Sequence, residues 1–201
     1  MNISFGKNIL LSQHRIYDKQ QQKFVNANLY EIDGNDESDI DYIARQAGSW
    51  GALRTYMTMD MATKHSTLSS GGELTDFDKY TLPNNKFYSL ENDEGKSIGL
   101  LETTGYANFR DVHYFQADPD KKYKYVGQVM LAEAAKDIAD KEDAELTVND
   151  PSNQGREFYM KCGFKQRDEN PHRLYMQQED MLDFIENVQE NTKGANVDFV
   201  A

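Results

Sequence analysis

Three lysines and a glycine stand where an expected strand turns into an expected helix. Lys121, Lys122 and Lys124 follow the end of the strand, and Gly127 opens the helical pattern. The first turn of a helix leaves backbone N–H groups unpaired, and the helix dipole adds positive charge there. Such a turn binds phosphate, and a glycine lets a ligand approach the backbone closely. The spacing therefore predicts a phosphate-binding turn, with a solvated charged loop as the alternative.

A second segment with chemical potential, residues 158–164, reads Phe-Tyr-Met-Lys-Cys-Gly-Phe. It closes a helical pattern, and Gly163 is expected to end that helix in a left-handed conformation. Tyr159 can serve as a proton donor or as a packing residue. Cys162 is the only cysteine, and no histidine pattern accompanies it, so it is not expected to act as a nucleophile.

Together the two segments resemble the acyl-CoA-binding core of the GNAT superfamily of N-acetyltransferases. The family pattern is a strand, a bend with proline, and then Arg/Gln-x-x-Gly-x-Gly/Ala at the start of a helix. The matching run is Lys122-Tyr123-Lys124-Tyr125-Val126-Gly127. Tyr125 replaces the first glycine, and it can still offer its backbone N–H to a phosphate if its dihedral angles are ordinary. The family's later helix carries Phe-Tyr-x-Lys-x-Gly-Phe, which residues 158–164 fit.

The resemblance implies an α/β fold with a mixed, mostly antiparallel central sheet, a splayed pair of parallel strands and flanking helices. Acetyl-CoA would be the acyl donor, with its pantetheine between strands 109–117 and 144–148. The implied cofactor contacts are Phe115, Ala117, Lys122, Tyr123, Lys124, Tyr125, Val126, Gly127, Asn153 and Tyr159. The implied reaction is direct attack of a primary amine on the thioester. A backbone N–H would stabilise the oxyanion, and Tyr159 would protonate the leaving thiolate.

The base that takes the proton of the amine is open between Glu102 and His113. Each lies on an expected strand beside the proposed cleft. A carboxylate can take the proton directly or through water, and an unperturbed imidazole titrates near neutral pH. We prefer Glu102. The four histidines show no metal-ligand spacing, so no metal site is expected.

These residues need strands and helices to position them. Strand patterns cover 24–32, 86–91, 96–104, 109–117, 144–148, 164–167 and 172–177. Helical patterns cover 40–47, 52–65, 124–140, 151–162 and 181–188, and a long loop is expected over 66–84. Strands that alternate with helices imply parallel pairing. We expect one domain, 1–201, with 1–22 as an N-terminal extension and 178–201 as a C-terminal helix and tail.

Composition restricts the classes of partner. The chain of 201 residues has 22 Lys and Arg against 34 Asp and Glu, a net charge of −12. This balance argues against nucleic acid and anionic membranes, because proteins bind both through Lys and Arg. It favours small cationic partners. A single cysteine allows no intrachain disulfide, and no apolar run reaches the roughly 18 residues of a membrane helix, so a cytoplasmic location is expected.

Two questions of function stay open at this level. The acceptor amine can belong to a small molecule or to a protein, and residues 50–84 are expected to form much of its site. The alternative to an enzyme is a catalytically inactive module of the same fold that binds CoA or a protein. The acidic segment 178–190 fits a solvated helix face, and it also leaves a homodimer contact open.

Overall fold

The computed structural model describes residues 9–32 and 86–192. The strands are β1 (Ile9–Asp18), β2 (Lys23–Ile32), β3 (Lys86–Asn92), β4 (Ser97–Tyr106), β5 (Phe109–Ala117), β6 (Tyr123–Lys124), β7 (Glu145–Asn149), β8 (Lys165–Gln166) and β9 (Arg173–Gln177). The helices are α4 (Val126–Lys136), α5 (Asn153–Lys161) and α6 (Gln178–Thr192). Within this part of the chain, the strands form one nine-stranded sheet in the order β6-β1-β2-β3-β4-β5-β7-β9-β8.

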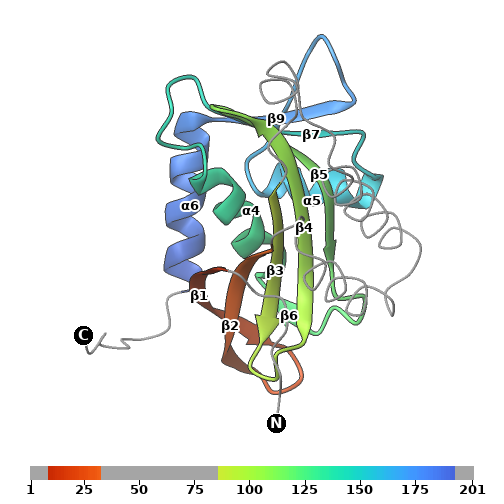
Figure 1. Ribbon diagram of the computed structural model, residues 1–201. Coiled ribbons are helices and arrows are strands. Elements are labelled where there is room, and N and C mark those ends of the chain that lie inside the picture. The colour runs from red at the N-terminus through yellow and green to blue at the C-terminus, as the bar shows by residue number, and fades with distance from the viewer. Residues whose placement is uncertain (1–8, 33–85, 193–201) are drawn as a thin grey trace, which may run out of the picture.

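The sheet is antiparallel except for one pair of strands. β5 and β7 run parallel, from Phe109 opposite Glu145 to Val112 opposite Val148. The helices α4 and α6 lie side by side on one face of the sheet (Figure 1). This mixed, mostly antiparallel sheet with one parallel pair and flanking helices confirms the predicted fold class, including the predicted partners in the parallel pair.

The helix α4 is the centre of the core, because most of its eleven residues are buried. A glycine on the facing strand lets α4 approach the sheet closely. Opposite it on β4, a Cβ added to Gly99 would lie 2.5 Å from the sulfur of Met130 and 2.8 Å from Val126 Cγ1. This close packing positions the N-terminal half of α4 directly against β4.

The first strand of the sheet was not predicted. No strand was placed within the expected N-terminal extension 1–22, yet β1 pairs along its length with β2 and at its end with β6. Its buried side chains at alternate positions are His14, Ile16 and Asp18. Because two of the three are polar, the period-2 apolar pattern of a half-buried strand is hidden in the sequence.

The other boundaries are close to those predicted. The predicted strands from 24–32 onwards appear as β2, β3, β4, β5, β7, β8 and β9. The helix predicted over 124–140 is shorter, because Tyr123–Lys124 pair with β1 and the helix ends at Lys136. The predicted helices 40–47 and 52–65 and the loop 66–84 lie outside the described residues. No described helix has the length and apolar character needed to cross a membrane.

Candidate functional site

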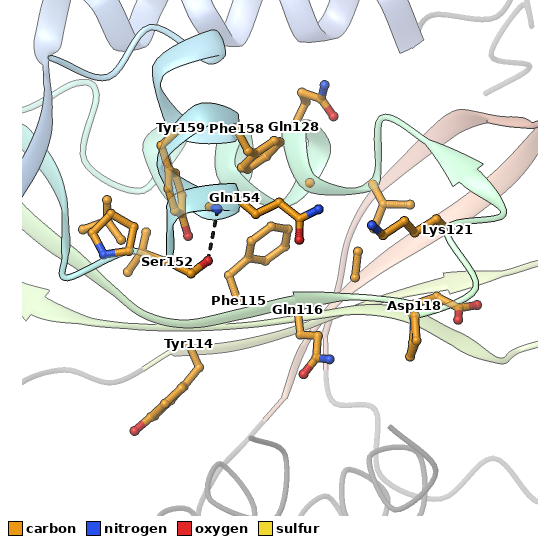
Figure 2. A pocket seen from close by; sticks show the side chains of 18 of the residues that line it. Tyr114, Phe115, Gln116, Asp118, Lys121, Gln128, Ser152, Gln154, Phe158 and Tyr159 are labelled. Atoms are coloured by element: carbon orange, nitrogen blue, oxygen red, sulfur yellow. Dashed lines mark hydrogen bonds between the residues drawn. The ribbon is translucent and has the colours of Figure 1, made fainter. Parts of the chain in front are cut away.

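A cleft opens where β5 and β7 separate. β7 pairs with β5 only as far as Val112, whereas β5 continues to Ala117. The space between them has a volume of about 980 Å³ (Figure 2). Its lining comes from β5, the loop before α4, the first turn of α4, the end of β7 and α5.

A β-bulge marks the point of separation. On β4, Glu102 is opposite Tyr114 and Thr103 is opposite Val112, so His113 is an extra residue on β5. A bulge bends its strand and increases the local twist. This bend directs the second half of β5 away from β7.

The second half of β5 presents main-chain groups to the cleft. The N–H of Asp118 donates to the carbonyl of Ile98 in β4 at 2.8 Å. Because hydrogen-bonding direction alternates along a strand, Phe115 and Ala117 direct their N–H and C=O groups to the opposite edge, where β7 has diverged. These are the two residues for which main-chain contacts to pantetheine are expected.

The N-terminal end of α4 faces the same cleft. Tyr125 precedes the helix, and no side chain of the described residues caps it. By contrast, Ser152 caps α5, since its Oγ accepts a hydrogen bond from the N–H of Gly155 at 3.1 Å. The first N–H groups of α4 therefore keep their capacity to bind an anion.

Tyr125 has a backbone geometry that is uncommon for a tyrosine. The condition of ordinary dihedral angles is not met, because its φ is 72° and its ψ is −4°, in the left-handed region. Glycine adopts that region freely, whereas other residues do so at an energetic cost. The Tyr125 ring stacks on Phe24 with 6.3 Å between centroids and an interplanar angle of 11°. The turn thus keeps a glycine-like backbone while a tyrosine ring packs on the β1–β2 hairpin.

The lysines of the turn have different environments. Lys121 and Lys124 line the cleft, and the Lys124 ammonium lies 5.2 Å from the centre of the Tyr17 ring. Lys122 was expected to contact phosphate, but it does not line the cleft. Its ammonium pairs with the buried Asp18 carboxylate at 3.2 Å. Its side chain therefore fastens the turn to β1.

Asp18 shows why this ion pair is structural. Burial alone would raise the pKa of Asp18, but hydrogen bonds from the backbone N–H of Gln21 and Gln20 and from Lys122 hold it below its ordinary value. The carboxylate is therefore charged and fully engaged at neutral pH.

Lys19 is a cleft residue that sequence reasoning missed. Its ammonium donates to the carbonyl of Lys121 at 2.5 Å, and its side chain lines the cleft. It lies about one hundred positions away in the chain, in the turn between β1 and β2. Only the pairing of β1 with β6 brings it to the phosphate-binding turn, and nothing in its local sequence predicts that pairing.

Gly127 is required by packing as well as by access to the backbone. A Cβ at this position would lie 2.6 Å from Phe158 Cζ and 3.0 Å from Phe115 Cζ. These two rings stack on one another across the cleft wall, with centroids 5.7 Å apart. The absence of a side chain at Gly127 therefore allows the first turn of α4 to pack closely against α5 and β5.

Tyr159 lies on α5 and lines the cleft beside Phe158 (Figure 2). Its ring makes edge contacts with Phe158 and Phe164, at centroid distances of 5.4 and 5.3 Å. Burial raises the pKa of Tyr159 well above its ordinary value, with smaller contributions from Cys162 and Asp111. The phenol is therefore protonated at neutral pH, as a proton donor must be.

Two further predictions concern α5 and its end. Asn153 is the first residue of α5 and is absent from the cleft lining, whereas Asn149 and Gln154 do line the cleft. Figure 2 shows the Gln154 side chain extending from α5 over Phe115. Burial raises the pKa of the Cys162 thiol to about 12, so the thiol is neutral and a poor nucleophile.

The two candidate bases lie next to one another. His113 lines the cleft, and its Nδ1 is 3.8 Å from Oε1 of the fully buried Glu102. Glu102 itself does not line the cleft. Among residues 9–32 and 86–192, no group of three or more His, Cys, Asp or Glu side chains could hold a metal ion.

Comparison with known proteins identifies the architecture. No family model matches the chain, and no curated protein matches it. A mutant of the AtaT toxin, bound to the C-terminus of the antitoxin AtaR and acetyl-CoA, aligns with a TM-score of 0.53. The alignment covers 80% of this chain and 98% of that one, at 12% identity. A protein from Desulfovibrio desulfuricans assigned to the GNAT family of acetyltransferases also gives 0.53, at 12% identity, over 76% of this chain and 99% of that one.

The chain has the GNAT fold. A spermidine N-acetyltransferase chimera, made from Vibrio cholerae SpeG and hSSAT, aligns at a TM-score of 0.51 and 15% identity, over 78% of this chain and 98% of that one. In this GNAT fold, the two segments that carry the sequence resemblance pack against one another, and both contribute residues to the lining of one cleft. Residues 122–127 lead into α4, and residues 158–164 close α5.

Proposed function

We propose that the protein is an acetyl-CoA-dependent N-acetyltransferase that moves an acetyl group to a primary amine. One observation carries the proposal: a single cleft joins the open edge of β5 to the uncapped N-terminal end of α4. An open strand edge suits an extended amide chain such as pantetheine, because main-chain groups can pair with its amides. A helix N-terminus suits the pyrophosphate of CoA.

The chain supplies a group for each part of the donor. Phe115 and Ala117 would pair with pantetheine, and the first N–H groups of α4 would bind the phosphates. Lys19, Lys121 and Lys124 add positive charge at that end, in a protein whose net charge is −12. A main-chain N–H at the open edge of β5 would stabilise the oxyanion that forms when the amine attacks the thioester carbonyl.

Tyr159 would protonate the departing thiolate of CoA. Its burial keeps the phenol protonated, and the rings of Phe158 and Phe164 hold it in place. A positioned acid of this kind contributes roughly 10²–10⁴-fold to a rate.

A small cationic amine is the acceptor we would test first. The net charge favours the approach of cations, and a spermidine N-acetyltransferase chimera shares the fold. Spermidine is therefore the first probe, followed by lysine-containing peptides for a protein acceptor. The exclusion of nucleic acid and membranes, the cytoplasmic location and the homodimer stay predictions.

Binding of the donor is the first test. Isothermal titration calorimetry with acetyl-CoA should show binding to the wild type, and Lys121→Glu should weaken it at least about tenfold, because a carboxylate would face the phosphates. Lys141→Glu is the matched control. This exposed lysine pairs with the neighbouring Asp140 and is not part of the cleft lining, so affinity should be unchanged. A folded wild type that does not bind acetyl-CoA would overturn the proposal.

Turnover is the second test. Release of CoA thiol in the presence of spermidine or peptide amines should fall about 10- to 100-fold in Tyr159→Phe, with calorimetric affinity unchanged, because the ring packing is kept and only the proton donor is lost. Acetyl-CoA binding without turnover of any amine would favour the alternative, an inactive CoA-binding module of the same fold.

A further inference from the structure

The β-bulge places an imidazole at the point where the cleft between β5 and β7 begins. His113 is the extra residue of the bulge, at the point where β5 leaves β7. Its side chain is 42% exposed and lines the cleft, and its ring stacks on Tyr114 with centroids 4.5 Å apart. A half-exposed ring that is held on one side can exchange protons with a substrate on the other.

The other side of this imidazole faces a buried carboxylate. Glu102 is fully buried on the neighbouring strand, and its Oε1 lies 3.8 Å from Nδ1 of His113. A carboxylate beside Nδ1 favours the tautomer with the proton on that nitrogen. This leaves Nε2 as the basic nitrogen available to the cleft.

The nearest carboxylate on the same strand is engaged elsewhere, so it does not compete with Glu102 for the His113 ring. Asp111, two residues earlier on β5, accepts hydrogen bonds from Thr147 Oγ1 at 2.6 Å and Asn149 Nδ2 at 2.9 Å. Its charge is therefore directed toward β7. The Tyr114 phenol belongs to the ring that stacks on the imidazole, and the Tyr159 phenol lines the same cleft.

We infer that His113 and Glu102 act as a pair in acetyl transfer, with His113 as the base that takes the proton of the amine and Glu102 as the residue that positions it. The inference rests on the proposed function and resolves the choice that the sequence leaves open. Glu102, preferred from sequence, is fully buried and does not line the cleft, whereas His113 does, so the imidazole stands between this carboxylate and the cleft.

The reaction balances with these groups. The amine nitrogen forms a bond to the thioester carbonyl carbon, and Nε2 of His113 takes the proton from the nitrogen, which has become positively charged. The C–S bond then breaks, and the thiolate takes the phenolic proton of Tyr159. The imidazolium returns its proton through water to the phenolate, so that the products are the amide, CoA thiol and the starting form of the protein.

The pairing is tested without any acceptor. The two ring nitrogens of His113 are followed by ¹⁵N NMR at a fixed pH, with their signals assigned by their absence in His113→Gln. In Glu102→Gln, the ring proton should no longer favour Nδ1, because the carboxylate beside that nitrogen is lost, so the two nitrogen signals should shift in opposite directions. Glu91→Gln is the matched control, since it is an equally buried glutamate on β3 outside the cleft, and it should leave both signals unchanged. Unchanged nitrogen signals in Glu102→Gln overturn the pair.

The catalytic role is tested with the acetyl-CoA calorimetry and thiol-release assays together. His113→Gln should lower kcat/KM about 10²-fold or more while acetyl-CoA affinity stays within about twofold of the wild type. Glu102→Gln should lower kcat less than His113→Gln does, and Glu102→Asp, which keeps a carboxylate, should recover part of that loss. Full activity of His113→Gln overturns the inference while the proposed function stands, whereas loss of acetyl-CoA binding by the wild type overturns the proposed function itself.

Discussion

The two halves of β5 differ in what satisfies their polar groups. Phe109–Val112 are paired on both edges, with β4 on one side and β7 on the other. In this half, Arg110 is buried and bonds to Asp137 with Nε–Oδ2 of 2.8 Å. Past the bulge, Tyr114–Ala117 keep only the β4 side, and the other edge borders the cleft.

This difference shows how one strand serves both the fold and the site. Polar groups of the first half find their partners inside the protein, so they are structural. Main-chain groups on the open edge of the second half face a cavity large enough for a ligand, and the bulge at His113 is the boundary between the two. Changes on either side of this boundary should therefore affect different measurements.

The largest expected effect is on stability, at Arg110 in the closed half. Replacing it with methionine keeps an unbranched chain but leaves Asp137 with Lys86 as its only described cation, at 2.5 Å. Breaking a buried ion pair costs about 3–5 kcal/mol, and the partial exposure of Asp137 reduces this to roughly 2–3 kcal/mol. Urea denaturation measures the difference. His113→Gln, from the open half, should cost less than about 1 kcal/mol, and equal losses in the two variants would remove the distinction between the halves.

The same ion pair should make the closed half sensitive to acid. Burial alone would raise the pKa of Asp137, but Lys86 and Arg110 together hold it below its ordinary value. A carboxyl group whose pKa is lower in the folded state stabilises the protein above its unfolded pKa of about 4, and that contribution is lost as pH falls through the folded value. The free energy of unfolding should therefore decline below about pH 4, and Arg110→Met should show a weaker decline.

The boundary itself is tested by deleting His113. Deletion leaves Tyr114–Ala117 opposite the same residues of β4 and removes only the extra residue, so the bend of the bulge is lost. Without the bend, the second half of β5 would follow β7 further and narrow the cleft, and affinity for acetyl-CoA should fall about 100-fold by calorimetry. His113→Gln keeps the extra residue and should keep the affinity. Wild-type affinity after deletion, with circular dichroism confirming the fold, would show that the bulge does not control the cleft.

The sequence predicted the closed half of this comparison better than the open half. Strand patterns over 109–117 and 144–148 identified β5 and β7, and the helical signal between them implied parallel pairing, which is confirmed. The bulge has no local signature, because His113 is one more residue in a continuous strand pattern. The contribution of Lys19 depends on β1, whose core-facing His14 and Asp18 conceal it. Where polar residues occupy the buried positions of a strand, the pattern of apolar residues in the sequence does not reveal which positions are buried.

The positive φ at Tyr125 is a second feature that the sequence did not predict, and it gives the smallest expected effect on stability. A tyrosine in the glycine position of the family pattern suggests a changed backbone, yet the structure keeps the left-handed angles and accommodates the ring against Phe24. If the backbone conformation at position 125 determines the geometry of the turn, the free energy of unfolding should be about 1 kcal/mol higher for Tyr125→Gly than for Tyr125→Ala. The reason is that only glycine adopts φ of 72° without strain.

Three residues further on, inside α4, the relative stability of the glycine and alanine variants should reverse. Gln128→Ala should be more stable than Gln128→Gly by a similar amount, because alanine favours the helix interior and glycine does not. Acetyl-CoA affinity of Tyr125→Gly should stay within a few-fold of the wild type, since the N–H groups of the turn keep their directions. A tenfold loss of affinity in Tyr125→Gly would instead assign ligand contacts to the ring. In that case the phosphate end of the cleft would depend on a side chain from its own turn, whereas the open half of β5 would depend on main-chain groups alone.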